Sequence, residues 1–210
     1  MNVHSASECN QGRIMKNTDK REEIIQAALE LIAEQGFHGA PMAMVAEKAG
    51  VGAGTIYRYF ESKDALIAEI FSELEKKVVE YLLQGYSRDR TLRERFIYLS
   101  TMIIRYFMAN AMHFRFIEQY MNSPYGVSLR RERLLEEARD IDLFRNLLQE
   151  GIDRQALKDL PITLHFALAF GPILSLLRDH ILGFMKLDDE LIRKAAEACW
   201  DGVRRQDVPG

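Results

Sequence analysis

The chain has 210 residues, of which 48% are hydrophobic, and a formal net charge of -3 at pH 7. This length is enough for one large core or for a small module joined to a larger one, and the composition argues against extensive disorder. The acidic balance gives no general support for a polyanionic partner, so a nucleic-acid interface has to be argued from local residues. Only Cys9 and Cys199 are present, so we expect neither a disulfide framework nor a thiolate metal site.

Helical periodicity dominates from Asp19 onward, and nothing alternates apolar with polar residues for long enough to indicate a strand. The predicted fold class is therefore all-α. Caps and apolar stripes predict helices over residues 19–36, 41–50, 53–60, 62–85, 91–110, 111–122, 128–150 with a break near Asp140, 161–183 and 188–205.

Membrane insertion and export are not expected. The first sixteen residues hold no apolar run of the kind found in signal peptides. Residues 160–177 lack formal charge, but Arg178 and Asp179 follow directly and no second such segment exists. We therefore expect a buried helix there and a cytoplasmic protein.

The segment KAGVGAGTIYRYFESKDAL, residues 48–66, places three glycines between two predicted helices. No strand leads into them and their spacing differs from phosphate-binding loops, so nucleotide binding is not indicated. A helix, a short glycine turn and a second helix instead indicate a helix-turn-helix. Gly50 suits the positive φ past a helix end, and Gly52 suits an N-cap. Gly54, inside the helix, costs about 1 kcal/mol, which is tolerable where the backbone approaches the preceding helix or a DNA strand.

The short helix after these glycines has a polar face and an apolar face. Ile56 and Phe60, four residues apart, are expected to hold it to the core. Hydroxyl groups suit phosphates and arginine suits guanine edges, so the remaining side chains favour DNA binding.

The markers EQGF, VAEKAGV and GTIYRYFESKDAL, between residues 34 and 66, resemble the DNA-binding domain of the TetR family of bacterial transcriptional regulators. The resemblance covers about the first third of the chain. It implies a flexible arm at 1–18, a helix-turn-helix domain at 19–62, a ligand-binding and dimerisation domain at 63–205, and a flexible end at 206–210. It implies DNA contacts from Gly52, Ala53, Thr55, Tyr57, Arg58, Tyr59 and Lys63.

Within this set, the resemblance assigns Tyr57, Tyr59 and Lys63 to phosphates, and Thr55 and Arg58 are candidates for base edges. The chain departs from the family pattern where Ala40 and Pro41 replace hydroxyl residues that cap the second helix, where Gly52 replaces a common serine, and where Ala53 replaces a longer polar residue. These departures predict fewer polar contacts in each half-site. Basic residues between Arg13 and Arg21 form either an arm on the DNA backbone or a solvated tail.

A helix-turn-helix that reads a palindrome needs a two-fold dimer. By resemblance, the last two helices form a four-helix dimer interface, with an ordinary intrachain core as the alternative. The candidate interface residues are Ile173, Leu174, Leu177, Leu191, Ala195, Ala198 and Cys199.

The region between these ends is rich in aromatic residues and methionine. Such residues are individually typical of a core, but together they suit a pliable apolar pocket. The candidate effector-binding residues are Tyr98, Met102, Tyr106, Phe116, Gln119, Tyr120, Phe144 and His165. The histidines are too scattered for a metal site, and neither a metal nor another cofactor is expected.

The sequence thus predicts a homodimeric repressor that binds double-stranded operator DNA and is released by a small apolar or amphipathic effector. The alternative is an all-α protein, catalytic or not, that binds a small molecule without DNA affinity. No nucleophile with an adjacent base and no paired carboxylates are found, so we expect no enzyme. A membrane-associated helical protein is a third class.

Overall fold

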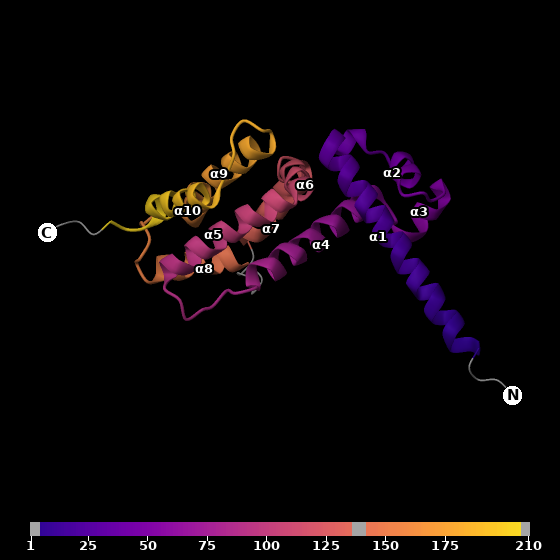
Figure 1. The fold of residues 1–210 in the computed structure, drawn as a ribbon, viewed down its shortest axis with the longest axis horizontal. Helices are drawn as coiled ribbons and strands as arrows, with labels where there is room; N and C mark the ends of the chain where they lie inside the picture. Colours follow the sequence, from indigo (N-terminus) through magenta and orange to yellow (C-terminus); the bar gives the residue numbers. More distant parts are fainter. Residues whose placement is uncertain (1–4, 136–141, 207–210) are drawn as a thin grey trace. The chain divides into compact units, whose positions relative to one another are not determined.

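The computed structural model describes residues 5–135 and 142–206, with side chains at 20–131 and 142–206. Ten α-helices and no strand are present in these residues, which confirms the all-α prediction (Figure 1). The helices are α1 Ser5–Gly39, α2 Met42–Lys48, α3 Ala53–Tyr59, α4 Lys63–Leu83, α5 Leu92–Ala109, α6 Ala111–Met121, α7 Pro124–Leu135, α8 Leu143–Asp153, α9 Ile162–Ile181 and α10 Asp189–Val203.

Two helix boundaries differ from the prediction. Helix α1 begins at Ser5 rather than at Asp19, so residues 5–18 are helical, and a flexible arm at 1–18 stays a prediction. The segment predicted over 128–150 with a possible break corresponds to two helices, α7 and α8, and α7 begins at Pro124 rather than at Ser128. The predicted break near Asp140 lies outside the described residues.

The chain divides into two compact units. Unit 1 contains residues 1–75 and 112–128, and unit 2 contains residues 76–111 and 129–210. Helix α6 and the first turn of α7 therefore belong with the helix-turn-helix rather than with the later helices, and α4 contributes to both units.

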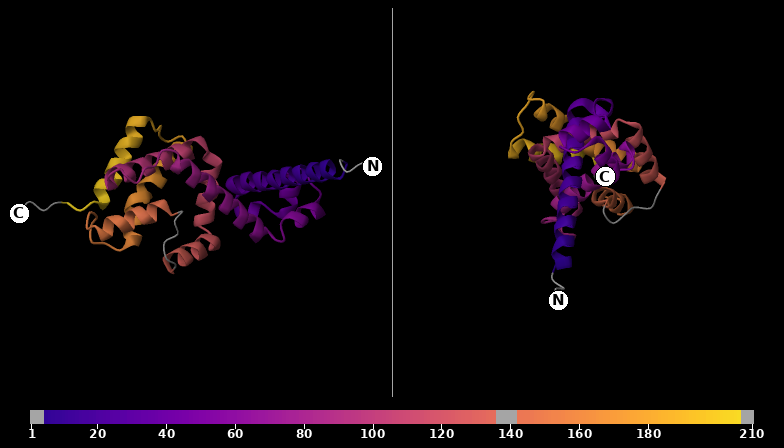
Figure 2. Two further views of the ribbon diagram at one scale, coloured as in Figure 1. Left: turned by 90° about the horizontal axis from the view of Figure 1, so that it is seen from below. Right: turned by 90° about the vertical axis from the view of Figure 1, so that its right-hand side faces the viewer.

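In unit 1, α2 and α3 lie on one side of α1 (Figure 2). The apolar stripe of α1 is buried, with Ile24 and Ala28 fully enclosed. At Gly36, φ is 70° and ψ is 178°, so α1 is kinked near its end. The predicted cap of α4 is confirmed, because the backbone N–H of Ala65 donates to the Ser62 hydroxyl at 3.1 Å.

Aromatic rings join α1, α4, α6 and α7 within unit 1. Phe71 and Tyr120 are stacked with their ring centroids 4.2 Å apart, and Phe37 contacts both Phe116 and Tyr125. Gly126 allows the corner between α6 and α7 to close, because a Cβ there would lie 2.5 Å from the backbone of Met121. A side chain larger than hydrogen at Gly126 would force these helices apart.

Unit 2 is built around α5, which packs against α8, α9 and α10. Thr91 and Glu94 form a capping box at its start, and Asp188 caps α10. The buried guanidinium of Arg95 makes two hydrogen bonds to the carboxylate of Glu150, at 2.8 and 2.5 Å. This ion pair ties α5 to α8.

Helix α9 is apolar but only partly covered by its own chain. Ile173 and Leu177 are buried, whereas Leu164 and Leu174 on another side are 42% and 39% exposed. The expectation of a buried helix thus holds for one face. Among the described helices, α9 alone has the length and composition of a membrane span, a test that core helices of soluble proteins also pass.

Candidate functional site

The turn between α2 and α3 has the backbone geometry that its glycines predict. Gly50 has a φ of 63°, in the left-handed region that favours glycine. Gly52 is the N-cap of α3 and accepts a hydrogen bond from the backbone N–H of Thr55 at 2.7 Å. The predicted helix-turn-helix geometry is therefore confirmed locally.

Helix α3 is held by its apolar side and presents its polar side. Ile56 is completely buried and Phe60, just past the helix, is also buried. Tyr57 is 56% exposed and Arg58 is exposed, while Tyr59 is half-buried. Hydroxyl groups and a guanidinium therefore stand on a surface that the core fixes in place.

The other predicted DNA contacts extend this surface at both ends. Gly52 and Ala53 are exposed, and Thr55 is half-buried. The Arg58 guanidinium lies 5.4 Å from the ring centroid of Tyr59, which orders its stem over the aromatic face. These contacts keep the arginine on the helix surface.

Lys63 has an intrachain role that the sequence did not indicate. Its ammonium donates a hydrogen bond to the backbone carbonyl of Phe37, near the end of α1. Partial burial lowers the pKa of Lys63, while the neighbouring Asp64 opposes this shift. A phosphate contact from Lys63 stays a prediction, and it would compete with this bond.

Arg21 likewise has partners in its own chain. Its guanidinium pairs with Glu69 at 2.6 Å and with Glu73 at 3.0 Å, which joins α1 to α4. Of the basic residues expected to form an arm, Arg21 therefore stabilises the domain. Arg13 and Lys16 have no described side chains.

The departures from the family pattern have a visible consequence. Pro41 is the N-cap of α2 and provides no side-chain cap, and Ala40 is buried.

Gly54 is exposed, and a Cβ built on it would have no atom within 4 Å except its own local neighbours. Close approach of α2 therefore does not explain this glycine, and approach of a DNA strand stays a prediction.

The predicted effector-binding residues are divided between the two units. Phe116, Gln119 and Tyr120 lie in unit 1, where the two rings join the aromatic cluster and Gln119 lies against Gly36. In unit 2, Tyr106 packs on Tyr81 with ring centroids 5.3 Å apart. The core of each unit thus uses several of these rings.

The remaining predicted residues lie in three parts of unit 2. Phe144 contacts Phe170 edge-on, with ring centroids 4.4 Å apart. His165 is completely buried, and its Nε2 lies 3.0 Å from the carbonyl of Lys158. Tyr98 and Met102 line a groove of about 710 Å³ between α5 and α10. Tyr98 and Met102 therefore lie beside open space that a ligand could fill.

Part of the dimer prediction is corrected by burial within the single chain. Ile173, Leu177 and Cys199 are at most 3% exposed, because α5, α9 and α10 enclose them. Burial also raises the pKa of the Cys199 thiol. These three residues belong to the intrachain core. Leu174 and Ala198 are exposed, and Leu191 and Ala195 are partly exposed, so they stay candidates.

Comparison with known families agrees with both halves of the chain. Residues 24–70 match the family described as bacterial regulatory proteins, tetR family. Residues 91–204, more than half of the chain, match the family described as tetracyclin repressor-like, C-terminal domain.

Individual proteins show the same likeness over most of their length. A TetR family transcription regulator from Marinobacter aquaeolei VT8 is 25% identical, with a TM-score of 0.79 over 91% of this chain and 99% of that one. A TetR family regulator from Vibrio parahaemolyticus is 31% identical, with a TM-score of 0.71 over 89% and 99%. The fatty acid metabolism regulator protein of Bacillus subtilis (strain 168) is 27% identical over 173 residues, 80% of this chain and 87% of that protein.

Proposed function

This chain belongs to the TetR family and is a ligand-responsive DNA-binding transcriptional regulator, and we propose that it is a homodimeric repressor of a palindromic operator. The observation that carries the proposal is α3, with Ile56 buried beneath and Tyr57 and Arg58 exposed above. Thr55 and Arg58 read base edges, and Tyr57 and Tyr59 contact phosphates. Lys63 supplies a further phosphate contact. The protein acts in the cytoplasm.

The exposed side of α9 supports a dimer. Leu164, Ala167, Gly171 and Leu174 recur every three or four residues and are all exposed. Helix α10 runs beside α9, with Ala195 and Ala198 on a side of small residues (Figure 1). We propose that these two helices pair with their copies in a second subunit, because water-exposed leucines at helical spacing favour burial against an apolar surface.

The effector is proposed to be a small amphipathic molecule. One relative of this chain is named a fatty acid metabolism regulator, which makes acyl compounds the first class to screen. An effector can release the operator only if its affinities for the bound and free conformations differ, typically by about 1–3 kcal/mol.

The test is fluorescence anisotropy of the purified protein with labelled duplexes that tile the DNA around its own gene. One palindromic tile is expected to bind tightly, with an affinity that falls as salt rises. Arg58→Ala should weaken binding to this tile by about 1–3 kcal/mol and reduce the preference of the protein for the tile over a scrambled duplex. Tyr57→Phe should weaken binding to the palindromic and the scrambled duplex by the same factor. Arg154→Ala, an exposed arginine of unit 2, is the matched control. Equal binding of all tiles by wild type and Arg58→Ala would refute the proposal.

A further inference from the structure

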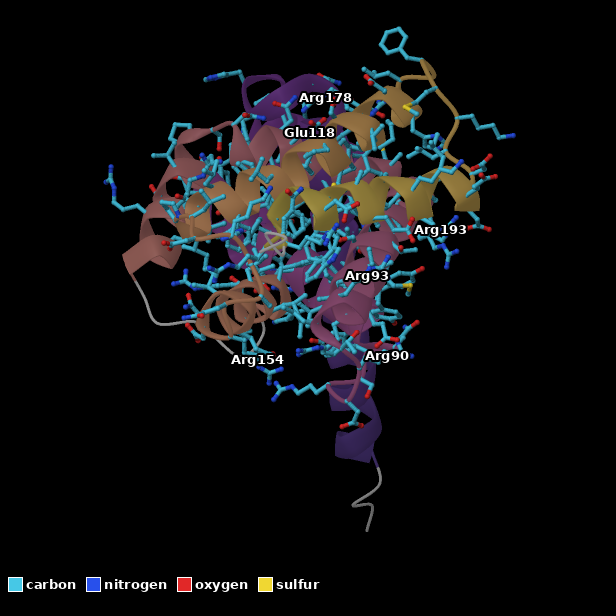
Figure 3. All side chains as sticks on the ribbon, turned by 90° about the vertical axis from the view of Figure 1, so that its left-hand side faces the viewer. Arg90, Arg93, Glu118, Arg154, Arg178 and Arg193 are labelled. Carbon is cyan, nitrogen blue, oxygen red and sulfur yellow. The ribbon has the colours of Figure 1, made fainter. Side chains whose placement is uncertain are left out.

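The groove between α5 and α10 combines an apolar floor with a basic rim. Ile97, Tyr98 and Met102 of α5 form the floor, and all three are half-buried. Arg90 just before α5, Arg93 in the first turn of α5 and Arg193 on α10 all line this groove, and Figure 3 shows them on the same side of unit 2. An apolar surface beside guanidinium groups suits a ligand that is apolar in one part and anionic in another.

The carboxylates of the groove already have partners. Glu94 accepts hydrogen bonds from Thr91 in the capping box, which is the first cause of its lowered pKa. Asp189 pairs with Arg105 at 2.7 Å. Glu190 pairs with Lys194 at 2.6 Å. Asp189 and Glu190 are therefore each paired with one cation, whereas the charges of Arg90 and Arg93 also act on Glu94 as smaller causes of its lowered pKa.

The guanidinium groups of the rim have fewer carboxylates than they can bind. Arg93 and Arg193 both pair with Glu197, at 3.5 and 2.9 Å. Arg90 makes no ion pair in the described part of the chain, and its guanidinium lies 5.3 Å from the ring centroid of Tyr98. An anionic group between Arg93 and Arg193 would thus gain two planar donors whose shared ion-pair partner is Glu197, with the charge of Glu94 also near Arg93.

We propose that this groove binds an amphipathic anion, with its apolar body on Tyr98 and Met102 and its phosphate, sulfonate or carboxylate group between Arg93 and Arg193. The flexible thioether of Met102 can adapt to bodies of different shape. This inference rests on the proposed function, because it assigns the groove as the effector site and names the chemical class of the effector.

The proposed dimer would leave this groove open. Successive residues of an α-helix are about 100° apart, so Leu191 and Ala195 lie on the opposite side of α10 from Arg193. Arg193 and Glu197, four residues apart, share the edge that faces α5. Pairing through the small-residue side of α10 and through α9 therefore does not use the rim of the groove.

The first experiment measures binding without DNA. Full-length protein is titrated with the anionic dye anilinonaphthalene sulfonate, whose fluorescence rises in apolar sites, and the dye is then displaced with dodecyl phosphate or with uncharged dodecyl maltoside. Dodecyl phosphate is expected to displace the dye at about tenfold lower concentration than the maltoside, because two charge-assisted contacts are available to it. Displacement of the dye at the same concentration of both compounds would overturn the inference that the ligand is an anion.

Substitutions then locate the site. In the double variant Arg93→Gln and Arg193→Gln, the affinity for dodecyl phosphate should fall about tenfold or more. Arg154→Gln removes an exposed arginine that also pairs with one carboxylate. Arg154 lies at the end of α8, away from the rim of the groove (Figure 3). This variant should bind like wild type. Circular dichroism confirms that both variants are folded. An unchanged affinity in the double variant, or displacement of the dye by an acidic peptide but not by dodecyl phosphate, would overturn the proposal.

Operator release separates the two proposals. If dodecyl phosphate releases the operator from wild type but not from the double variant, the groove is the effector site. If it binds in an arginine-dependent manner without releasing the operator, the anion site is supported and its role as the effector site is overturned. If no operator is bound at all, the proposed function fails, and the displacement experiment still decides whether the groove binds anions.

Discussion

The phenol of Tyr125 donates a hydrogen bond to the carboxylate of Asp64, at 2.5 Å, and joins the first turn of α7 to the first turn of α4. Helix α4 begins three residues after Phe60, so this bond lies close along the chain to α3, the proposed DNA-binding helix. It raises the pKa of Tyr125 to about 12, with burial as a second cause.

Replacing Tyr125 with phenylalanine should lower the free energy of unfolding by about 1 kcal/mol at pH 7, because Asp64 loses its donor. The folded-state pKa lies above the usual value of about 10 for tyrosine, so this contribution is complete below pH 10 and is lost as the pH rises toward 12. Urea unfolding from pH 7 upward measures it. Tyr57→Phe, at an exposed phenol, is the control and should change stability little. A Tyr125→Phe deficit that persisted undiminished at pH 12 would contradict this assignment.

The ion pair of Arg95 and Glu150 provides a second test of stability. The Arg95 side chain is 6% exposed, so removing its partner leaves a charge buried in unit 2. Glu150→Gln is expected to destabilise the protein by about 3 kcal/mol at pH 7. Glu190→Gln, whose partner Lys194 is exposed, should cost less than about 1 kcal/mol. Comparable losses of unfolding free energy in these two variants would show that the buried pair contributes no more to stability than an exposed pair.

The same pair predicts an acid-side effect. The hydrogen bond from Arg95 lowers the pKa of Glu150, with further contributions from Arg154 and Arg88. A carboxylate with a depressed folded-state pKa stabilises the protein above its unfolded pKa of about 4.3, and this contribution disappears as the pH falls further. The stability difference between wild type and Glu150→Gln should therefore shrink as the pH falls through the lowered folded-state pKa of Glu150. A stability difference between the two proteins that stayed constant down to pH 3 would contradict a contribution from the carboxylate charge of Glu150.

Replacing Gly54 is expected to change both the stability of the protein and its affinity for DNA. An alanine there meets no atom within 4 Å, so Gly54→Ala should raise the free energy of unfolding by about 0.5–1 kcal/mol. If a DNA backbone occupies that open side, the same variant should bind the operator less tightly. Denaturant unfolding and operator anisotropy measure the two effects, with a scrambled duplex as the reference. A stabilised variant with unchanged operator affinity would show that no DNA approaches this residue.

The helix-turn-helix was predictable because its signals are local. Glycine at Gly50 and Gly52 fixes a turn within a few residues, and the spacing of Ile56 and Phe60 shows which side of α3 is buried. Lys63 shows the limit of such signals, since an ammonium at a helix start suits a phosphate and a carbonyl equally well. The structure pairs it with Phe37, a residue far away in the sequence.

The proposed effector site was harder to predict because an aromatic residue does not indicate what it packs against. Tyr120 and Phe144 follow the same helical periodicity, yet one stacks on Phe71 and the other on Phe170. The groove depends instead on residues about a hundred positions apart, such as Arg93 and Arg193. Periodicity identified Ile173 as apolar and on one face, but the choice between an intrachain core and a dimer depends on how α5 covers α9.

Leu174 provides the sharpest test of the proposed dimer, because it is 39% exposed on α9 and lies away from the buried Ile173 and Leu177. Leu174→Glu places a charge on the proposed interface and should convert the dimer to a monomer in sedimentation velocity, while circular dichroism stays unchanged because the side chain is outside the core. Operator affinity should fall at least about tenfold, since one subunit reads only one half-site. Val127→Glu changes another exposed apolar residue, on α7, and should leave the dimer intact. A Leu174→Glu protein that sediments as a dimer would place the interface elsewhere than on this side of α9.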